Sequence, residues 1–164
     1  MMDWLSAVFT GPVLAFAGIF LAIGLCCIGS AKGLCLVGEA GAGLMTEDPS
    51  KFAQVLILQI LPSTNGIYGF VAGMLVMVKL ELFGGQMIYL DYEQGALLFF
   101  TCLPIAFVGM VGAIMQARVA AGVVSLVAKR PEDLAKGILI CVMIEFFTII
   151  GLLVTILLLF SLPF

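Results

Sequence analysis

Histidine is absent from this 164-residue sequence, and charge is scarce, with 7 basic and 10 acidic residues. Without histidine, thiol–imidazole catalysis and Cys/His zinc sites have no support, and all five cysteines fall inside apolar segments. The net charge of −3 and the lack of a long basic tract exclude a nucleic-acid partner, because phosphate binding requires clustered Lys and Arg. A phosphate loop of the GxxxxGKS/T kind is also missing, so ATP chemistry is not expected in this chain.

Apolar residues make up 63% of the sequence, and its mean hydropathy is +1.28. The few charges separate four apolar runs, at about 5–45, 52–80, 94–128 and 134–162. Each run exceeds the roughly 20 residues that a helix needs to cross a bilayer. Transmembrane barrels need short segments of alternating polarity, which do not occur here. We therefore predict an all-α membrane protein with four transmembrane helices.

The positions of the basic residues predict how the helices cross the membrane. Lys51 belongs to the first break (46–51) and three basic residues to the third break (129–136), whereas the middle break has only Lys79 nearby. The positive-inside rule then places 46–51 and 129–136 in the cytoplasm and both termini outside the cell membrane. Because no Lys or Arg precedes Lys32, the basic region of a cleaved signal peptide is missing, and we expect the first span to be retained.

The chain contains an internal duplication. A shift of 82 residues lays 49–69 over 131–151, with a proline, an alanine and the final glycine coinciding. Further upstream, a shift of 86 lays Ser30 over Gln116, and the difference of four residues predicts an extended or displaced cytoplasmic end of the first helix, near 33–43.

The duplication predicts two tandem helical hairpins, 1–80 and 81–164. Small residues recur at every fourth position from Gly18 on the first helix and from Gly109 on the third, which favours close helix contacts. Repeats of two spans each lie parallel in the membrane, unlike the inverted repeats of many transporters. This arrangement favours a homo-oligomeric ring of hairpins over an alternating-access carrier.

Glu145 lies in the middle of the fourth apolar run, and no other charge follows Lys136. A charge near the bilayer midplane costs at least about 2.5–3.5 kcal/mol, so an intramembrane acid indicates a functional site. The alternative is a permanently protonated or locally paired glutamate that only holds helices together. Under the shift of 82, Ser63 takes the place of Glu145 in the first hairpin, which predicts one ion per chain.

The second run is unusually polar around Pro62, which frees the carbonyl of residue 58 from its helical hydrogen bond. The third helix has a single uncharged polar side chain, Gln116, between 104 and 124. One carboxylate with amide, hydroxyl and carbonyl oxygens suits a hard monovalent cation such as Na⁺, and the same groups can instead hold a protonated glutamate. Four residues of the second run share one helix face by their i, i+3, i+4, i+7 spacing: Leu61, Thr64, Asn65 and Tyr68.

Several short motifs together carry a resemblance to a known family. The sequence resembles the duplicated proteolipid (the K or c subunit) of bacterial V-type and archaeal A-type ATPases over nearly its whole length. The motifs are GLCCIGSAKG (24–33), GEAGAGL (38–44), VLILQILP (55–62), TNGIYGF (64–70), LPIAF (103–107), Gln116 and IEFF (144–147).

The resemblance implies a set of ion ligands. In sodium-transporting members the ion is held by a glutamate, a glutamine and a helix-2 carbonyl, threonine and glutamine, with a tyrosine steadying the carboxylate. Asn65 replaces the expected glutamine and is one methylene shorter; Na⁺ is the favoured ion, and H⁺ is the alternative. We also expect Gln59, Ser63 and Thr148 beside this set. The matching positions are Glu145, Gln116, the Leu61 carbonyl, Thr64, Asn65 and Tyr68.

The resemblance further implies that the chain is a non-catalytic rotor subunit. Copies of it would form a ring in the lipid bilayer, turning against a stator membrane subunit that supplies an arginine and bound on the cytoplasmic side to a central-stalk subunit. Each Glu145 would exchange its ion at the stator. The alternatives are a small four-helix proton-coupled carrier or exporter, which would need more convergent polar groups, and a structural tetraspan-like protein, whose loops would be expected to carry paired cysteines.

Overall fold

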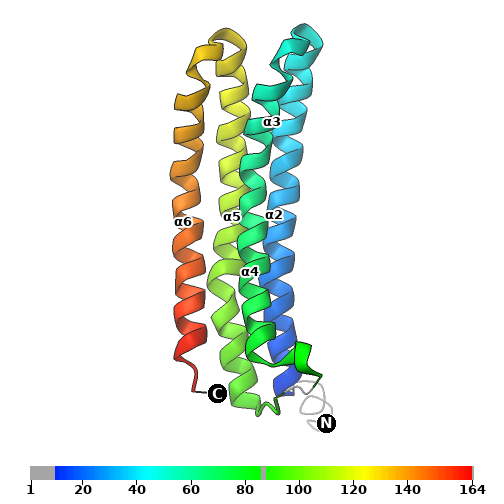
Figure 1. Ribbon diagram of the computed structural model, residues 1–164, viewed down its shortest axis with the longest axis vertical. Coiled ribbons are helices and arrows are strands. Elements are labelled where there is room, and N and C mark those ends of the chain that lie inside the picture. Colours follow the sequence, from blue (N-terminus) through cyan, green and yellow to red (C-terminus); the bar gives the residue numbers. More distant parts are fainter. Residues whose placement is uncertain (1–9, 86–87, 164) are drawn as a thin grey trace, which may run out of the picture.

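The computed structural model describes residues 10–85 and 88–163, which form four long helical rods side by side (Figure 1). All four rods are long and apolar enough to cross a membrane, which confirms the predicted all-α fold with four spans. The predicted start of the first span, 5–9, lies outside the described residues. The rods are α2 (Gly11–Glu47), the combined α3 (Phe52–Ile60), 3-10 turn (Leu61–Ser63) and α4 (Thr64–Lys79), α5 (Tyr92–Lys129) and α6 (Leu134–Ser161).

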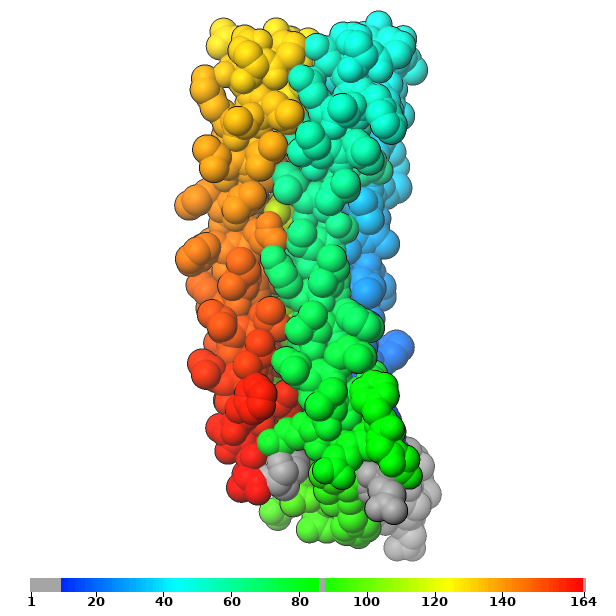
Figure 2. All heavy atoms as spheres, viewed as in Figure 1, coloured from blue at the N-terminus to red at the C-terminus, as the bar shows by residue number. Residues whose placement is uncertain are grey.

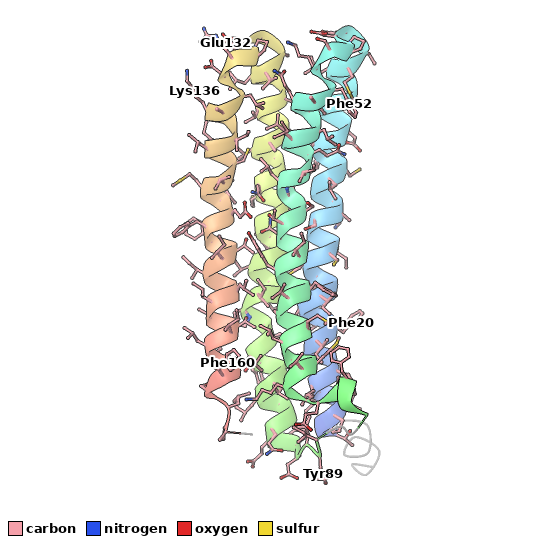
Figure 3. The ribbon with its side chains drawn as sticks, viewed as in Figure 1. Phe20, Phe52, Tyr89, Glu132, Lys136 and Phe160 are labelled. Carbon is pink, nitrogen blue, oxygen red and sulfur yellow. The ribbon has the colours of Figure 1, made fainter. Side chains whose placement is uncertain are left out.

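The two connections that are predicted to face the cytoplasm lie at the same end of the bundle. In Figure 1 the α2–α3 and α5–α6 connections are both at the top, and the α4–α5 connection is at the bottom. Figure 3 shows Glu132 and Lys136 at the end with the α2–α3 and α5–α6 connections, and Tyr89 at the opposite end. In the α2–α3 loop, hydrogen bonds from Ser50 to the Asp48 carboxylate, with Lys51 beside it, lower the pKa of Asp48. The assignment of this end to the cytoplasm stays a prediction.

Helices α2 and α5 form the most extensive contact between any two described elements. A Cβ atom on Gly29 would lie 2.6 Å from the Met110 carbonyl oxygen, and one on Gly18 would lie 2.9 Å from the Phe99 Cα atom. Because no side chain separates the helices at these points, their backbones pack directly against each other. The small residues on the first helix therefore have the predicted packing role.

The two halves repeat the same helix contacts at a constant shift of 82 residues. The predicted shift of 86 between α2 and α5 is wrong, because Ser30 corresponds to Gly112, and Leu34 corresponds to Gln116. The predicted four-residue displacement near 33–43 is also absent, since both hairpins keep one register up to their loops. The matching contacts are Gly41–Val55 with Val123–Gly137, Cys26–Gly69 with Val108–Gly151, and Ile23–Gly73 with Ile105–Thr155.

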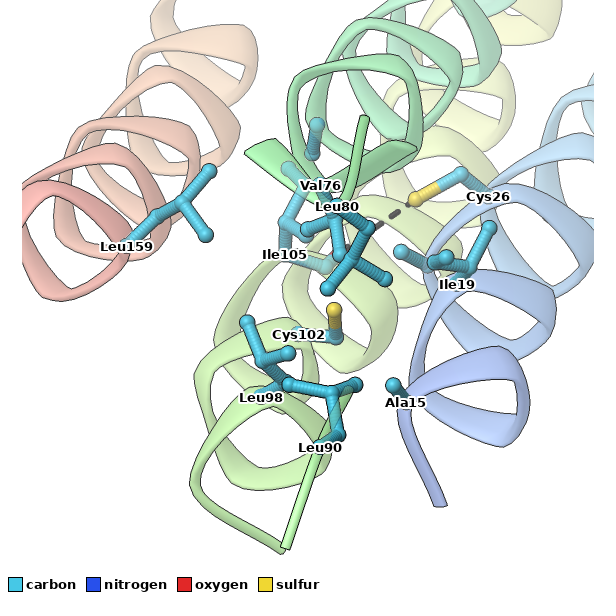
Figure 4. Packing of buried hydrophobic residues seen from close by; sticks show 12 residues of the cluster. Ala15, Ile19, Cys26, Val76, Leu80, Leu90, Leu98, Cys102, Ile105 and Leu159 are labelled. Carbon is cyan, nitrogen blue, oxygen red and sulfur yellow. Dashed lines mark hydrogen bonds between the residues drawn. The ribbon is translucent and has the colours of Figure 1, made fainter. Parts of the chain in front are cut away.

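Two apolar clusters fill the bundle, one toward each end. Figure 4 shows the cluster nearer the α4–α5 connection, where the Cys26 thiol donates to the Ile105 carbonyl oxygen at 3.3 Å. The second cluster, around Leu58, lies nearer the α2–α3 and α5–α6 connections. On the outside, large apolar side chains such as Phe20 (72% exposed) and Phe160 (70% exposed) project outward, as expected for a lipid-facing surface (Figure 3).

Five buried polar residues lie between the apolar clusters, at mid-height in the bundle. Figure 2 shows the face on which α6 and the α3–α4 rod run next to each other, and a hydrogen bond from Tyr68 to Glu145 joins α4 to α6. Buried polar groups need hydrogen-bond partners or a bound ligand, so this polar layer is the candidate site. Its members are Ser30, Asn65, Gln116, Glu145 and Thr148.

Candidate functional site

The α3–α4 rod is interrupted beside the polar layer. Pro62 lacks an amide hydrogen, and the backbone tightens to a 3-10 turn at Leu61–Ser63. From α2, the Ser30 hydroxyl enters the gap: it donates to the Pro62 carbonyl oxygen at 2.7 Å and accepts from the Gly66 amide at 2.8 Å. Ser30 thus replaces a backbone hydrogen bond and fixes the irregular segment.

Glu145 is the only carboxylate in the polar layer and is 8% exposed. The Tyr68 hydroxyl donates to its Oε1 atom at 2.6 Å, and Gln116 Nε2 donates to its Oε2 atom at 3.3 Å. The two hydrogen bonds come from α4 and α5, so three helices fix the carboxylate. Its oxygens are oriented by neutral donors alone.

Gln116 connects Glu145 to Asn65. Asn65 Nδ2 donates to Gln116 Oε1 at 2.7 Å, and both side chains are fully buried. Asn65 Nδ2 also lies 3.5 Å from the Pro62 carbonyl oxygen, and Gln116 Nε2 lies 3.5 Å from the Cys141 carbonyl oxygen. The amide groups therefore link the broken helix to the carboxylate.

The predicted Leu61 carbonyl and Thr64 hydroxyl lie together at the same break. The Thr64 hydroxyl donates to the Leu61 carbonyl oxygen at 2.9 Å. Among the described residues, no hydrogen bond joins this pair directly to Glu145; Tyr68, four residues beyond Thr64 on α4, donates to that carboxylate.

Two buried oxygen atoms of the layer have no hydrogen-bond partner among the described residues, Asn65 Oδ1 and Thr148 Oγ1. Both face Gly112 of α5. A Cβ atom there would collide with Thr148 Oγ1 and lie 3.5 Å from Asn65 Oδ1. Unsatisfied buried oxygens are costly, and here two of them lie near the same glycine of α5.

Two of the residues expected beside the site point elsewhere. Gln59 Nε2 donates to the Leu34 carbonyl oxygen at 3.2 Å, and the Ser63 hydroxyl donates to the Ile60 carbonyl oxygen at 2.5 Å within its own helix. Thr148 does lie in the layer. The roles of Ser30 and Gly112 were missed by sequence reasoning, although a serine that faces a helix break at a proline is a usable signal.

The chemistry of the layer fits a small monovalent cation. The ion pairs at Asp48 and Asp133 lie in the α2–α3 and α5–α6 connections, and none of them involves Glu145. The described residues also contain no cluster of three His, Cys, Asp or Glu side chains of the kind that holds a divalent or transition metal. A single carboxylate with neutral oxygens matches a charge of +1.

Comparisons with known proteins show the family of this chain. The family of the ATP synthase C subunit matches the chain twice, over residues 17–76 and 99–158. The V-type sodium ATPase subunit K of Enterococcus hirae is 42% identical over 158 residues, covering 96% of this chain and 97% of that protein. The A-type ATP synthase subunit K of Methanocaldococcus jannaschii is 40% identical over 65 residues, covering 40% of this chain and 30% of that protein. With two family repeats on four membrane helices, this chain belongs to the ATP synthase C-subunit family, as a duplicated, non-catalytic proteolipid of the V-type and A-type ATPases.

Proposed function

We propose that this chain is a rotor-ring subunit that binds one Na⁺ at Glu145 and carries it across the membrane as the ring turns. The observation that carries the proposal is Glu145 itself, a buried carboxylate near the middle of α6 that takes part in none of the ion pairs at Asp48 and Asp133. The family assignment favours this function over a four-helix carrier.

The preference for Na⁺ over H⁺ rests on the number of oxygen atoms that are available as ligands. Asn65 Oδ1 and Thr148 Oγ1 are buried without partners among the described residues, and the Leu61 carbonyl and Thr64 hydroxyl lie at the helix break. A proton on Glu145 would need one acceptor, whereas a sodium ion needs several oxygens around it. The related protein of Enterococcus hirae belongs to a sodium ATPase, which agrees with this choice.

The residues of this chain couple ion binding to movement through charge. With a cation bound, Glu145 and its ion are neutral together, and the site can face lipid. Without the cation, the carboxylate is an anion whose exposure to hydrocarbon costs at least about 2.5–3.5 kcal/mol. The empty site is therefore restricted to a polar surface, where a stator subunit supplies an arginine and the ion is exchanged. ATP chemistry takes place in other subunits.

Tyr68, Gln116 and Asn65 hold the carboxylate ready for the ion. Tyr68 and Gln116 each orient one oxygen of Glu145, and Asn65 fixes Gln116. Because these groups are neutral, they orient the carboxylate without adding a charge. The site of each copy lies between its own two hairpins, which gives one ion per chain.

Labelling with a hydrophobic carbodiimide tests the proposal, because the reagent attacks a protonated carboxyl group. In native membranes between about pH 5.5 and 8, a range that brackets neutrality, we expect labelling of Glu145 that Na⁺ suppresses, and no labelling of Glu145→Gln. Labelling that varies with pH but not with Na⁺ would assign the ring to H⁺. Absence of labelling at Glu145 under all conditions would contradict the rotor function.

A further inference from the structure

Two grooves open on the surface of the chain, one on each hairpin. One groove, of about 380 Å³, lies on the α2–α4 face and includes Cys27, Ser30, Leu34 and Ser63 in its lining. The other, of about 400 Å³, lies on the α5–α6 face and includes Phe147. Both grooves are mainly apolar and open to the surface of the chain, and the internal repeat indicates what fills them.

The α2–α4 groove corresponds, through the internal repeat, to a surface of the second hairpin that is already covered within the chain. When the sequence is shifted by 82 residues, the lining of the groove falls on the part of the second hairpin that contacts Asn65 of the first hairpin. Asn65 donates a hydrogen bond to Gln116 of α5. Its Oδ1 atom lies near Gly112, and its carbonyl oxygen lies near Gly109. The matches are Cys27 with Gly109, Ser30 with Gly112, Leu34 with Gln116, and Ser63 with Glu145.

The counterpart of Asn65 is Phe147, which is 67% exposed on α6. The described residues leave most of its side chain uncovered, although Asn65 at the matching position is fully buried. If the hairpin contact repeats from one copy to the next, Phe147 enters the groove lined by Cys27, Ser30 and Leu34. An exposed aromatic side chain and an open apolar groove are then buried together.

The α5–α6 groove agrees with the same pairing. Its lining residues Val111 and Met115 match Gly29 and Gly33, which pack against Met110 and Ala113 inside the chain. The counterparts of Met110 and Ala113 on α2 are Ile28 and Ala31, and both are exposed. Two independent sets of exposed residues therefore become covered by one repeated contact.

We propose that neighbouring copies of this chain join by repeating its internal hairpin contact, with Phe147 of one copy seated in the Cys27–Ser30–Leu34 groove of the next. This pairing rests on the proposed ring and specifies which faces meet. The contact is heterologous, because a different face of each copy takes part, and such contacts generate rings when the rotation closes.

The pairing also predicts that the contact between copies holds no cation. Each group of the Glu145 site has an apolar or weakly polar counterpart there. The substitutions remove the carboxylate, both amides and the phenol, leaving no charge to neutralise a cation. The counterparts are Ser63 for Glu145, Leu34 for Gln116, Phe147 for Asn65, and Ile150 for Tyr68.

Disulfide cross-linking between copies tests the pairing, using the native exposed Cys27. Phe147→Cys is made with Cys35→Ser, which removes the other exposed native thiol. Oxidation in native membranes is expected to give a ladder of dimers, trimers and larger species on non-reducing gels, because each copy contributes one thiol on each face. Adding Cys27→Ser should abolish the ladder.

The matched control is Phe146→Cys, since Phe146 is 64% exposed at the same depth but lies about 100° around the helix. A second pair, Leu34→Cys with Phe147→Cys in a chain lacking Cys27, should restore the ladder. Products that stop at dimers, or equal cross-linking of Phe146→Cys, would overturn the pairing. An intact ring on native gels without a cross-linked ladder would also overturn the pairing, but it would not contradict the proposed ring. Monomers alone on native gels would contradict the proposed ring.

Discussion

The Tyr68 hydroxyl donates a 2.6 Å hydrogen bond to Glu145 across the contact between the two hairpins. Tyr68 belongs to α4 and Glu145 to α6, so the bond depends on the packing of both halves of the chain. The carboxylate keeps its orientation only while the hairpins stay in register. Packing of the duplicated fold and ion binding are therefore linked through this pair.

Replacing Tyr68 by Phe should weaken ion binding without preventing assembly. The change removes one hydrogen bond to a charged group, worth about 1.5–3 kcal/mol, and keeps the aromatic ring in place. We expect the Na⁺ concentration that half-protects Glu145 from carbodiimide to rise by at least about tenfold, which corresponds to about 1.4 kcal/mol. Tyr92→Phe, at an exposed position, is the control, and an equal effect there would contradict the assigned role of Tyr68.

Replacing Thr148 by Val tests whether its hydroxyl binds the ion or whether the side chain only packs in the layer. Its hydroxyl oxygen is buried without a partner among the described residues, so removing it should raise the thermal unfolding temperature of the Na⁺-free ring slightly. If the oxygen faces the cation, Na⁺ protection should weaken several-fold in the same variant. Unchanged Na⁺ protection would show that Thr148 has no part in ion binding.

Replacing Ser30 by Ala should disturb the helix break. The Pro62 carbonyl and the Gly66 amide would lose the hydroxyl that bridges them, which costs about 1–3 kcal/mol for buried groups. Thermal unfolding of the purified ring should show a lower midpoint, and Na⁺ protection should weaken because the segment carries Leu61 and Thr64. A variant with wild-type values for both would refute the structural role of the bridge.

Replacing Gly29 by Ala should loosen the α2–α5 contact, because the added methyl group would meet the Met110 backbone at 2.6 Å. We expect a loss of about 1–3 kcal/mol in stability, as found for overpacked sites. Gly43 lies in the same helix with nothing within 4 Å of an added Cβ atom, so Gly43→Ala should be neutral or mildly stabilising. Similar unfolding midpoints for the two variants would argue against this close contact.

The four helices were predictable from the sequence because apolar runs of this length have one stable structure in a membrane. Helix bounds agreed within a few residues where the chain is described, as for 94–128 and Tyr92–Lys129. The repeat register between α2 and α5 was wrong because Ser30-Ala31-Lys32 resembles Gln116-Ala117-Arg118 in residue type. Packing contacts at Gly41 and Gly137 decide the register, and residue type alone does not reveal them.

The polar layer was predictable in part. Helical spacing placed Leu61, Thr64, Asn65 and Tyr68 on one face, and the structure brings this face to Glu145 and Gln116. The directions of the Gln59 and Ser63 side chains were not predictable from the sequence. Each donates to a backbone carbonyl oxygen outside the layer, and backbone partners of this kind do not depend on residue type. The bridge by Ser30 depends on how closely α2 approaches the break at Pro62, which is a property of three-dimensional packing.

Equilibrium binding of radioactive Na⁺ to the purified ring, counted per chain, tests the central claim most directly. We predict one Na⁺ per wild-type chain, one per chain in the surface control Glu39→Gln, and none in Glu145→Gln. Binding that persists in Glu145→Gln, or the absence of Na⁺ binding to the wild-type ring, would contradict the assignment of Glu145 as the sodium carrier.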